Sequence, residues 1–163
     1  EVVMEINDRV RGIAHNKNVA KITVLGVPDQ PGIAAAIFEP LSDAGISVDT
    51  IVQISGIGDL ADLTFTVGRE NLTKAVDIVH TVSKKIGARD CFGNAGLGNV
   101  RIIGTGMQNY PGYASLMFRS LYEADVNIEM ITTSEIRITC IVDEDKVEIA
   151  VRALHKAFNL EAK

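Results

Sequence analysis

The sequence predicts an α+β protein in which one strand-and-helix unit occurs twice. Lys21–Gly26 leads to the turn Asp29–Gly32, and Arg101–Gly106 leads to the turn Asn109–Gly112, so the second copy follows the first at an offset of 80 residues. After a loop that is five residues shorter in the second copy, the match resumes at an offset of 75, as in Leu63 with Ile138, Val67 with Val142, Ala75 with Ala150 and His80 with His155. Such a repeat predicts a pseudo-symmetric protein, and the seam between its copies is where a small ligand is usually sought.

The first copy has the pattern strand, helix, strand, strand, helix, strand. Short apolar runs bounded by glycine and proline predict the strands, and apolar residues at helical spacing, such as Ile33, Ile37 and Leu41, predict the helices. Gly45 and Gly87 are placed to end those helices. The expected elements are strands at 22–27, 47–54, 62–67 and 89–92 and helices at 32–45 and 72–86. Their order is that of the ferredoxin-like βαββαβ fold.

The second copy repeats this order but lacks its last strand. We expect strands at 100–106, 127–133 and 135–142 and helices at 112–124 and 146–158. The strand-like segment Arg9–His15 has no place in the first copy, so we expect this N-terminal strand to complete the second sheet. The two domains would then comprise residues 18–93, and residues 1–17 together with 99–163. The glycine-rich stretch Gly93–Asn99 is expected to be a flexible connector.

The composition excludes several functional classes. The net charge of −5 argues against nucleic acid, because phosphate binding depends on lysine and arginine. No apolar run approaches the ~20 residues that span a bilayer, and no secretory leader is recognised, so we expect no membrane partner and a cytoplasmic location. Cys91 and Cys140 fit neither a disulfide framework nor a metal site, which favours buried free thiols.

No catalytic constellation is evident in the sequence. His15, His80 and His155 are scattered along the chain, and the last two occupy the same position of the repeated second helix, which favours packing or surface roles. No metalloprotease, hydrolase, phosphate-loop or dinucleotide-binding spacing occurs. We therefore expect no catalytic residue, no metal and no cofactor in this chain.

The two Pro-Gly turns carry the only suggestive chemistry. Pro31-Gly32 and Pro111-Gly112 each precede a helix, whose unpaired N–H groups and dipole attract anions such as the α-carboxylate of an amino acid. Asp29, just ahead of the first turn, could hold an α-ammonium group. The alternative is that proline and glycine only shape the turn and Asp29 caps it. The residues alone leave both interpretations open.

A resemblance to a known family bears on that choice. Val24–Ala34, followed by Val48–Gln53, resembles the first ACT domain of aspartate kinase, and Gly104–Met107, Asn127–Ile131 and Thr133–Ile136 resemble its second ACT domain. The match covers nearly the whole chain. By length, the chain resembles the separate regulatory β subunit of a lysine-sensitive aspartate kinase, or a C-terminal fragment of the full enzyme.

The resemblance implies a regulatory function. Such ACT pairs bind lysine and/or threonine and mediate feedback inhibition of the catalytic α subunit or domain. They form homodimers with side-by-side sheets, in which the first ACT domain of one chain faces the second of its partner in an eight-stranded sheet. The effector-binding residues implied here are Asp29, Gln30, Gly32, Ile33, Ala34 and Gln53 in the first copy, with Asn127 and Ile128 from the facing second copy.

Two departures from the family pattern lie near the turns. Gln53-Ile54-Ser55 stands where the family usually has Gln-Asn-Val, and this bears on the identity of the effector. Asn109-Tyr110 replaces the common Ser-His before Pro111, so the second turn is expected to be a weaker or silent site.

Two alternative functions remain open at this stage. The first is an ACT regulatory subunit of another enzyme, such as acetolactate synthase with valine as effector, although the Thr133–Ile136 segment favours aspartate kinase. The second is a small ferredoxin-like enzyme of the acylphosphatase kind. That chemistry requires an arginine in a phosphate-binding loop, and neither Pro-Gly turn carries one.

Overall fold

The computed structural model describes residues 10–107 and 110–160. The chain divides into two compact units. The first unit, Asn18–Ala95, contains the first copy of the repeat. The second unit contains the second copy and joins the described residues up to Lys17 with those from Gly96 onward. This division follows from two long strands, β1 (Val10–Pro28) and β4 (Asp90–Gly104), each of which contributes to both units.

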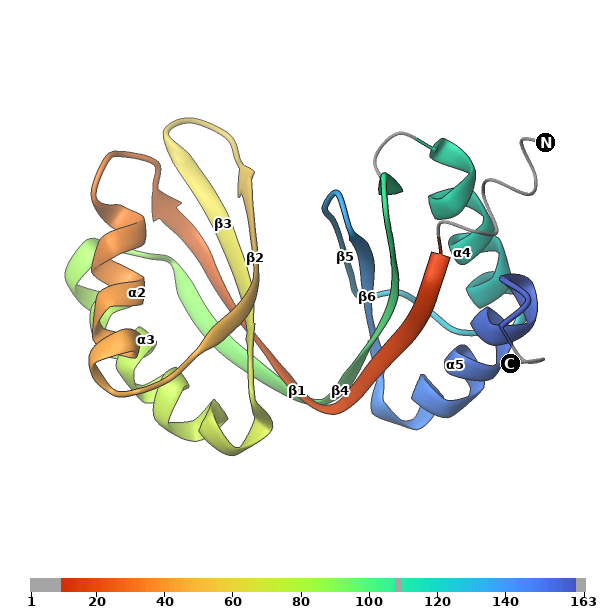
Figure 1. The fold of residues 1–163 in the computed structure, drawn as a ribbon. Coiled ribbons are helices and arrows are strands. Elements are labelled where there is room, and N and C mark those ends of the chain that lie inside the picture. Colours follow the sequence, from red (N-terminus) through yellow and green to blue (C-terminus); the bar gives the residue numbers. More distant parts are fainter. Residues whose placement is uncertain (1–9, 108–109, 161–163) are drawn as a thin grey trace. The chain divides into compact units, whose positions relative to one another are not determined.

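The first unit has the ferredoxin-like order. Between its parts of β1 and β4 lie α2 (Ile33–Asp43), β2 (Val48–Ser55), β3 (Leu60–Val67), a 3-10 turn (Arg69–Asn71) and α3 (Leu72–Ile86). Its strand order is β2-β3-β1-β4, with β3 antiparallel to both β1 and β2. Figure 1 shows α2 and α3 together on one face of this sheet.

The core of the first unit follows from its alternating strand pattern. Ile22 and Val24 of β1 and Phe65 of β3 are fully buried and pack under Ile37 and Leu41 of α2. One further contact fixes how α2 sits on the sheet, because the rings of Phe38 and Phe65 meet edge to face at 5.1 Å. Burial of these apolar side chains is the main stabilising contribution.

The second unit contains α4 (Pro111–Glu123), β5 (Met130–Thr133), β6 (Arg137–Asp143), a 3-10 turn (Glu144–Lys146) and α5 (Val147–Ala157). The strand order is β1-β4-β6-β5, and here too the helices cover one face (Figure 1). The N-terminal part of β1 supplies the strand that the second copy lacks, since Val10 and Ile13 pack in this unit's core. Lys17 Nζ also bonds Glu148 Oε1 of α5 at 2.5 Å. Arg9 lies outside the described residues.

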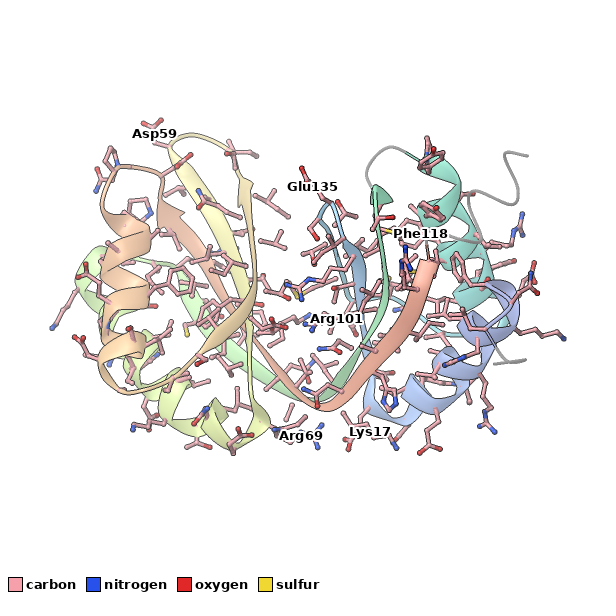
Figure 2. The ribbon with its side chains drawn as sticks, viewed as in Figure 1. Lys17, Asp59, Arg69, Arg101, Phe118 and Glu135 are labelled. Atoms are coloured by element: carbon pink, nitrogen blue, oxygen red, sulfur yellow. The ribbon has the colours of Figure 1, made fainter. Side chains whose placement is uncertain are left out.

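The core of the second unit is filled by larger side chains. Tyr113, Met117 and Leu121 of α4 are fully buried against Ile102 and Cys140. Phe118, labelled in Figure 2, packs against the same cluster. The ferredoxin-like α+β fold expected for both copies is therefore confirmed.

The prediction of a flexible connector at Gly93–Asn99 is wrong. These residues lie inside the continuous strand β4. The glycines permit close packing: a Cβ on Gly93 would lie 2.9 Å from side-chain atoms of Leu72 and Val76, and one on Gly98 would lie 2.4 Å from Val147 Cγ2 and 2.8 Å from the carbonyl oxygen of Asn16. Glycine here serves close approach between elements, which β-propensity alone does not reveal.

A second correction concerns the start of the strand expected at 127–133. In the structure β5 begins at Met130, so Asn127 and Ile128 lie in the connection that follows α4. The chain leaves α4 through Asp125, a non-glycine residue with φ of 59°, and pairs with β6 only from the bond between Glu129 N and the carbonyl oxygen of Ile141 onward.

Candidate ligand-binding site

A pocket of about 190 Å³ opens in the first unit where β1 ends and α2 begins. Its volume lies below the ~300–1,000 Å³ typical for drug-sized ligands, so it suits a metabolite of amino-acid size. Strands β2 and β3 complete its walls. The lining residues are Val27, Pro28, Asp29, Gln30, Pro31, Gly32, Ile33, Ala34, Gln53, Ala61 and Leu63.

The turn between β1 and α2 is tied to the neighbouring hairpin. The Asp29 N–H donates to the carbonyl oxygen of Asp59 at 2.7 Å, and the Gln30 N–H donates to that of Pro28 at 3.1 Å. Asp59 lies near the end of the β2–β3 hairpin (Figure 2). The first bond fixes the turn against the residue that precedes β3, and the second shapes the turn itself. The side chains of Asp29 and Gln30 are exposed at the rim.

Gly32 sets the geometry of the helix start. It is the N-cap of α2 and has φ of 91°, in the left-handed region that favours glycine. Its side-chain position is open, because a Cβ there would meet no atom within 4 Å. No side chain caps this helix start, and the Ile33 N–H has only a long 3.4 Å contact with the carbonyl oxygen of Gln30. Ile33 and Ala34, the first residues of α2, line the pocket, and the first N–H groups of a helix have no intrahelical acceptor.

The pocket combines three kinds of surface. Val27, Ala61 and Leu63 form an apolar floor, the start of α2 contributes backbone donors, and Asp29 and Gln53 add a carboxylate and an amide. An anion is favoured at a helix N-terminus, whereas a cation is favoured beside a carboxylate. The arrangement is thus suited to a small zwitterion.

The structure brings together six of the eight effector residues expected from the sequence. Asp29, Gln30, Gly32, Ile33, Ala34 and Gln53 all line this pocket. Asn127 is exposed and Ile128 is half-buried, and both belong to the second unit. They were expected to reach the site from a partner chain, so their role stays a prediction.

Sequence reasoning missed five lining residues, namely Val27, Pro28, Pro31, Ala61 and Leu63. Val27, Pro28 and Pro31 could have been found because they flank the Asp29–Gly32 turn. Ala61 and Leu63 alternate along β3 and are buried, so their pattern also fits an ordinary core strand. Only their pairing with Val27 and Gln53 identifies them as pocket floor.

The second unit has a different helix start. Here α4 begins at Pro111, Tyr110 is the N-cap with extended backbone, and Gly112 lies inside the helix. Tyr113, at the position of Ile33, is fully buried and meets Tyr110 edge to face at 5.6 Å. At the repeat offsets, Val27 becomes Met107 and Ala61 becomes Ile136. Larger side chains thus occupy positions that line the first unit's pocket. Asn109 lies outside the described residues.

The described residues offer no metal site, since no group of three or more His, Cys, Asp or Glu side chains that could hold a metal ion is found among them. Cys91 is half-buried, Cys140 is buried, and both are free thiols. Burial raises the pKa of Cys91, and it raises the pKa of Cys140 to about 12. Neither thiol is activated as a nucleophile. In 10–107 and 110–160, no helix is long and apolar enough to cross a membrane.

Comparison with known proteins gives a family match in each copy. A model described as the ACT domain matches residues 21–83, and a second model with the same description matches residues 100–158. The aspartokinase of Pseudomonas aeruginosa is 44% identical over 153 residues, which cover 94% of this chain and 37% of that protein. The aspartokinase of Corynebacterium glutamicum is 38% identical over 151 residues, covering 91% and 36%. The chain thus spans little more than a third of these relatives.

Two solved structures contain chains that this chain covers over nearly their full length. A chain in the crystal structure of aspartokinase alpha and beta subunits is 42% identical, with a TM-score of 0.83 and coverage of 92% of this chain and 99% of that one. The ligand-free regulatory subunit of aspartate kinase from Thermus thermophilus is 36% identical, with a TM-score of 0.85 and the same coverage.

Proposed function

Because this chain belongs to the aspartokinase family and consists of a pair of ACT domains from its regulatory part, we propose that it binds lysine and/or threonine and mediates feedback inhibition of aspartate kinase. The effector site is the pocket of the first unit. This family membership favours aspartate kinase over the acetolactate synthase and acylphosphatase alternatives. The observation that carries the proposal is the convergence of backbone donors, Asp29 and Gln53 on one pocket of metabolite size.

The start of α2 is the proposed site for the effector's α-carboxylate. Gly32 in its left-handed conformation opens the helix N-terminus, and the N–H groups that follow can donate to a carboxylate without losing an intrahelical partner. The helix dipole adds a favourable field within the first turn. Since no side chain caps this end, the carboxylate would act as its cap.

Asp29 and Gln53 are the proposed partners of the remaining polar groups. The Asp29 carboxylate can accept from the α-ammonium group, and a charge-assisted bond of this kind is among the stronger hydrogen bonds. The Gln53 amide can both donate and accept. It reaches the pocket from β2, opposite Leu63 of β3. Such pairing leaves no charged group of the zwitterion unsatisfied on burial, which would otherwise be costly.

The proposed partner is the catalytic α subunit or domain of aspartate kinase. Support comes from the aspartokinase alpha and beta subunits, since a chain of that crystal structure is covered to 99% by this one. Inhibition requires an effector with different affinity for two states of the assembly. A coupling of about 1–3 kcal/mol would change activity roughly 5–150-fold. We place this regulation in the cytoplasm, with the rest of the enzyme.

We also propose a homodimer with side-by-side sheets. The strand order ends at β2 in the first unit and at β5 in the second. Ile51 of β2 and Ile131 of β5 occupy matching positions in the repeat and are 52% and 45% exposed. Exposed apolar edge strands favour pairing with another chain. In this dimer Asn127 and Ile128 of the partner would reach the pocket. Sedimentation that finds only monomer at saturating lysine and threonine would contradict it.

The effector site is tested by calorimetry with Asp29→Ala. We expect the affinity for the bound amino acid to fall roughly 10–150-fold, because a charge-assisted hydrogen bond contributes about 1.5–3 kcal/mol. Asp77→Ala is the matched control, since Asp77 is an exposed residue of α3 in the same unit that does not line the pocket. The melting temperature of both variants should stay near that of the parent. Equal affinity in the parent and Asp29→Ala would contradict this site.

A further inference from the structure

We propose that Asp62 is a positioning residue for the effector pocket: its carboxylate holds a β-bulge in β1 that brings Val27 and Pro28 to the pocket wall. The inference rests on the proposed function and adds a residue to it. Asp62 does not line the pocket, although its neighbours Ala61 and Leu63 do. It must therefore act through another part of the chain.

The bulge lies between two regular stretches of the β1–β3 pairing. Val24 is opposite Leu63, whereas Val27 is opposite Ala61, so three steps along β1 match two steps along β3. Leu25 and Gly26 thus share Asp62 as their single opposite residue. Gly26 has φ of 64°, in the left-handed region expected at a bulge.

Asp62 satisfies the donor that the bulge leaves without a ladder partner. The Gly26 N–H donates to Asp62 Oδ1 at 3.0 Å, and the Asp62 side chain is partly buried. A partly buried backbone N–H without a partner would be unfavourable, because it loses its hydrogen bond to water without gaining another. The residue opposite the bulge therefore supplies, from its own side chain, the acceptor that the bulged backbone needs.

Arg89 closes the other side of the bulge. Its N–H donates to the carbonyl oxygen of Leu25 at 2.8 Å, and its Cβ lies 2.9 Å from where a Cβ on Gly26 would be. Gly26 is thus held between Asp62 and Arg89, with no room for a side chain. Both contacts lie inside the first unit, so they define the local backbone whatever surrounds it.

The position of the bulge matters because side chains alternate along a strand. One extra residue exchanges the faces of all the residues that follow it. With the bulge, Val27 is opposite Ala61 and lines the pocket together with Pro28. A regular β1 would direct these residues differently and would shift the turn at Asp29. The Asp62 bond therefore acts on the pocket wall and on the ammonium-binding residue together.

The second unit supplies an independent observation. Gly106, the counterpart of Gly26, has φ of 62°, so the same left-handed glycine occurs there. Gly106, however, lies beyond the end of β4 at Gly104, and the pairing of β4 with β6 runs without a register shift. Arg137, the sequence counterpart of Asp62 at the offset of 75, is opposite Ile103, and its guanidinium group has no acceptor. Among the described strand pairs, a bulge held by a carboxylate is thus found in the unit with the pocket and not in the β4–β6 pairing, which favours a role in the site over a general role in the fold.

The test compares Asp62→Asn with Asp62→Leu in calorimetry with lysine and with threonine. Asparagine keeps an acceptor oxygen at the same reach, so its affinity should stay within about twofold of the parent. Leucine is of similar size but has no acceptor, and we expect its affinity to fall about fivefold, which corresponds to the loss of one hydrogen bond of on the order of 1 kcal/mol. The Gly26 amide resonance should move in Asp62→Leu and stay near its parent position in Asp62→Asn. Asp62→Val, which suits a strand, replaces Asp62→Leu should that variant fail to fold.

The outcomes separate the two proposals. A parent chain that binds neither amino acid overturns the proposed function, and the role of Asp62 with it. A parent that binds, with Asp62→Leu binding equally well, overturns only the role of Asp62. Equal weakening in Asp62→Asn and Asp62→Leu also overturns it, because the charge of the carboxylate would then matter and not its bond to Gly26.

Discussion

The two units of this protein share a fold and a Pro-Gly turn but differ at the start of their first helix. In the first unit, Gly32 lies outside α2 in a left-handed conformation, and Ile33 is only partly buried. In the second unit, Gly112 lies within α4, and Tyr113 is fully buried. The same dipeptide therefore builds an open helix end in one unit and a closed helix start in the other.

This difference shows how a duplicated scaffold can keep its architecture and change one site. The strands and helices keep their order because their apolar periodicity is the same in both copies. The pocket depends on a few side-chain volumes, namely Val27, Ile33 and Ala61, which become Met107, Tyr113 and Ile136 in the second copy. Met107 and Tyr113 extend the core of their unit at these positions, whereas Ile136 is exposed.

The largest difference should appear in the reactivity of the two thiols. Cys140 of the second unit is fully buried with a pKa of about 12, whereas Cys91 of the first unit is half-buried. Since the thiolate is the reactive form, we expect a thiol reagent at pH 8 to modify Cys140 at least ~100-fold more slowly than Cys91. Peptide mass spectrometry separates the two, and full reaction of both in concentrated urea is the control. Similar rates of modification of Cys91 and Cys140 in the folded protein would contradict the close packing around Cys140.

A large loss of stability is expected when the buried Tyr113 at the start of α4 is replaced by a small residue. Tyr113→Ala should lower the free energy of unfolding by about 3–5 kcal/mol, as for other buried aromatic residues. Ile33→Ala, its counterpart in the first unit, should cost less than about 2 kcal/mol because Ile33 is partly exposed. Urea unfolding measures both. Equal losses would show that the two helix starts are packed alike, contrary to the comparison.

Smaller changes in the free energy of unfolding, opposite in sign to each other, are expected when each of the two turn glycines is replaced by alanine. Gly32→Ala should cost about 1–2 kcal/mol, because alanine disfavours the left-handed conformation. Gly112→Ala should raise the free energy of unfolding by about 0.4–1 kcal/mol, because Gly112, the second residue of α4, has a helical backbone that alanine adopts with a smaller loss of entropy. Neither new Cβ would meet an atom within 4 Å, so sterics do not confuse the comparison. Gly32→Ala should also weaken effector binding in calorimetry, and Gly112→Ala should not. Changes in unfolding free energy of the same sign in both variants would contradict the distinction between the two turns.

Much of the fold could be predicted from the sequence because both copies have clear periodicity. Ile37 and Leu41 mark the buried face of α2, and both are fully buried as expected. The predicted helices differ from the observed ones by only a few residues. The continuity of β4 could not be predicted, because glycine has low strand propensity and Gly98 is required there by the close approach of Val147.

The residues of the candidate site that lie next to the Pro-Gly turn could be predicted from the sequence, whereas those on other elements were harder to identify. Asp29, Gln30 and Gly32 all belong to the four-residue turn that contains the Pro-Gly pair, so recognising the turn identifies them together. The conformations of Gly32 and Gly112 could not be told apart, because the sequence is Pro-Gly in both. The difference lies in tertiary packing, where the buried Tyr113 accompanies the earlier helix start. The bond of Asp62 to Gly26 depends on a register shift that no local pattern reveals.

The path of β1 has a consequence for the order in which the protein is built. The strand begins in the core of the second unit at Val10 and ends at the first unit's pocket at Pro28. During synthesis the first unit has all its strands and helices once Ala95 has left the ribosome. The start of β1 must then wait for the part of β4 from Gly96 onward, with which it pairs, and for the helices α4 and α5 that complete the core around it. One domain is thus nested within the other, and any exchange of modules between homologues must move the inner domain as an insert and the outer one as two pieces.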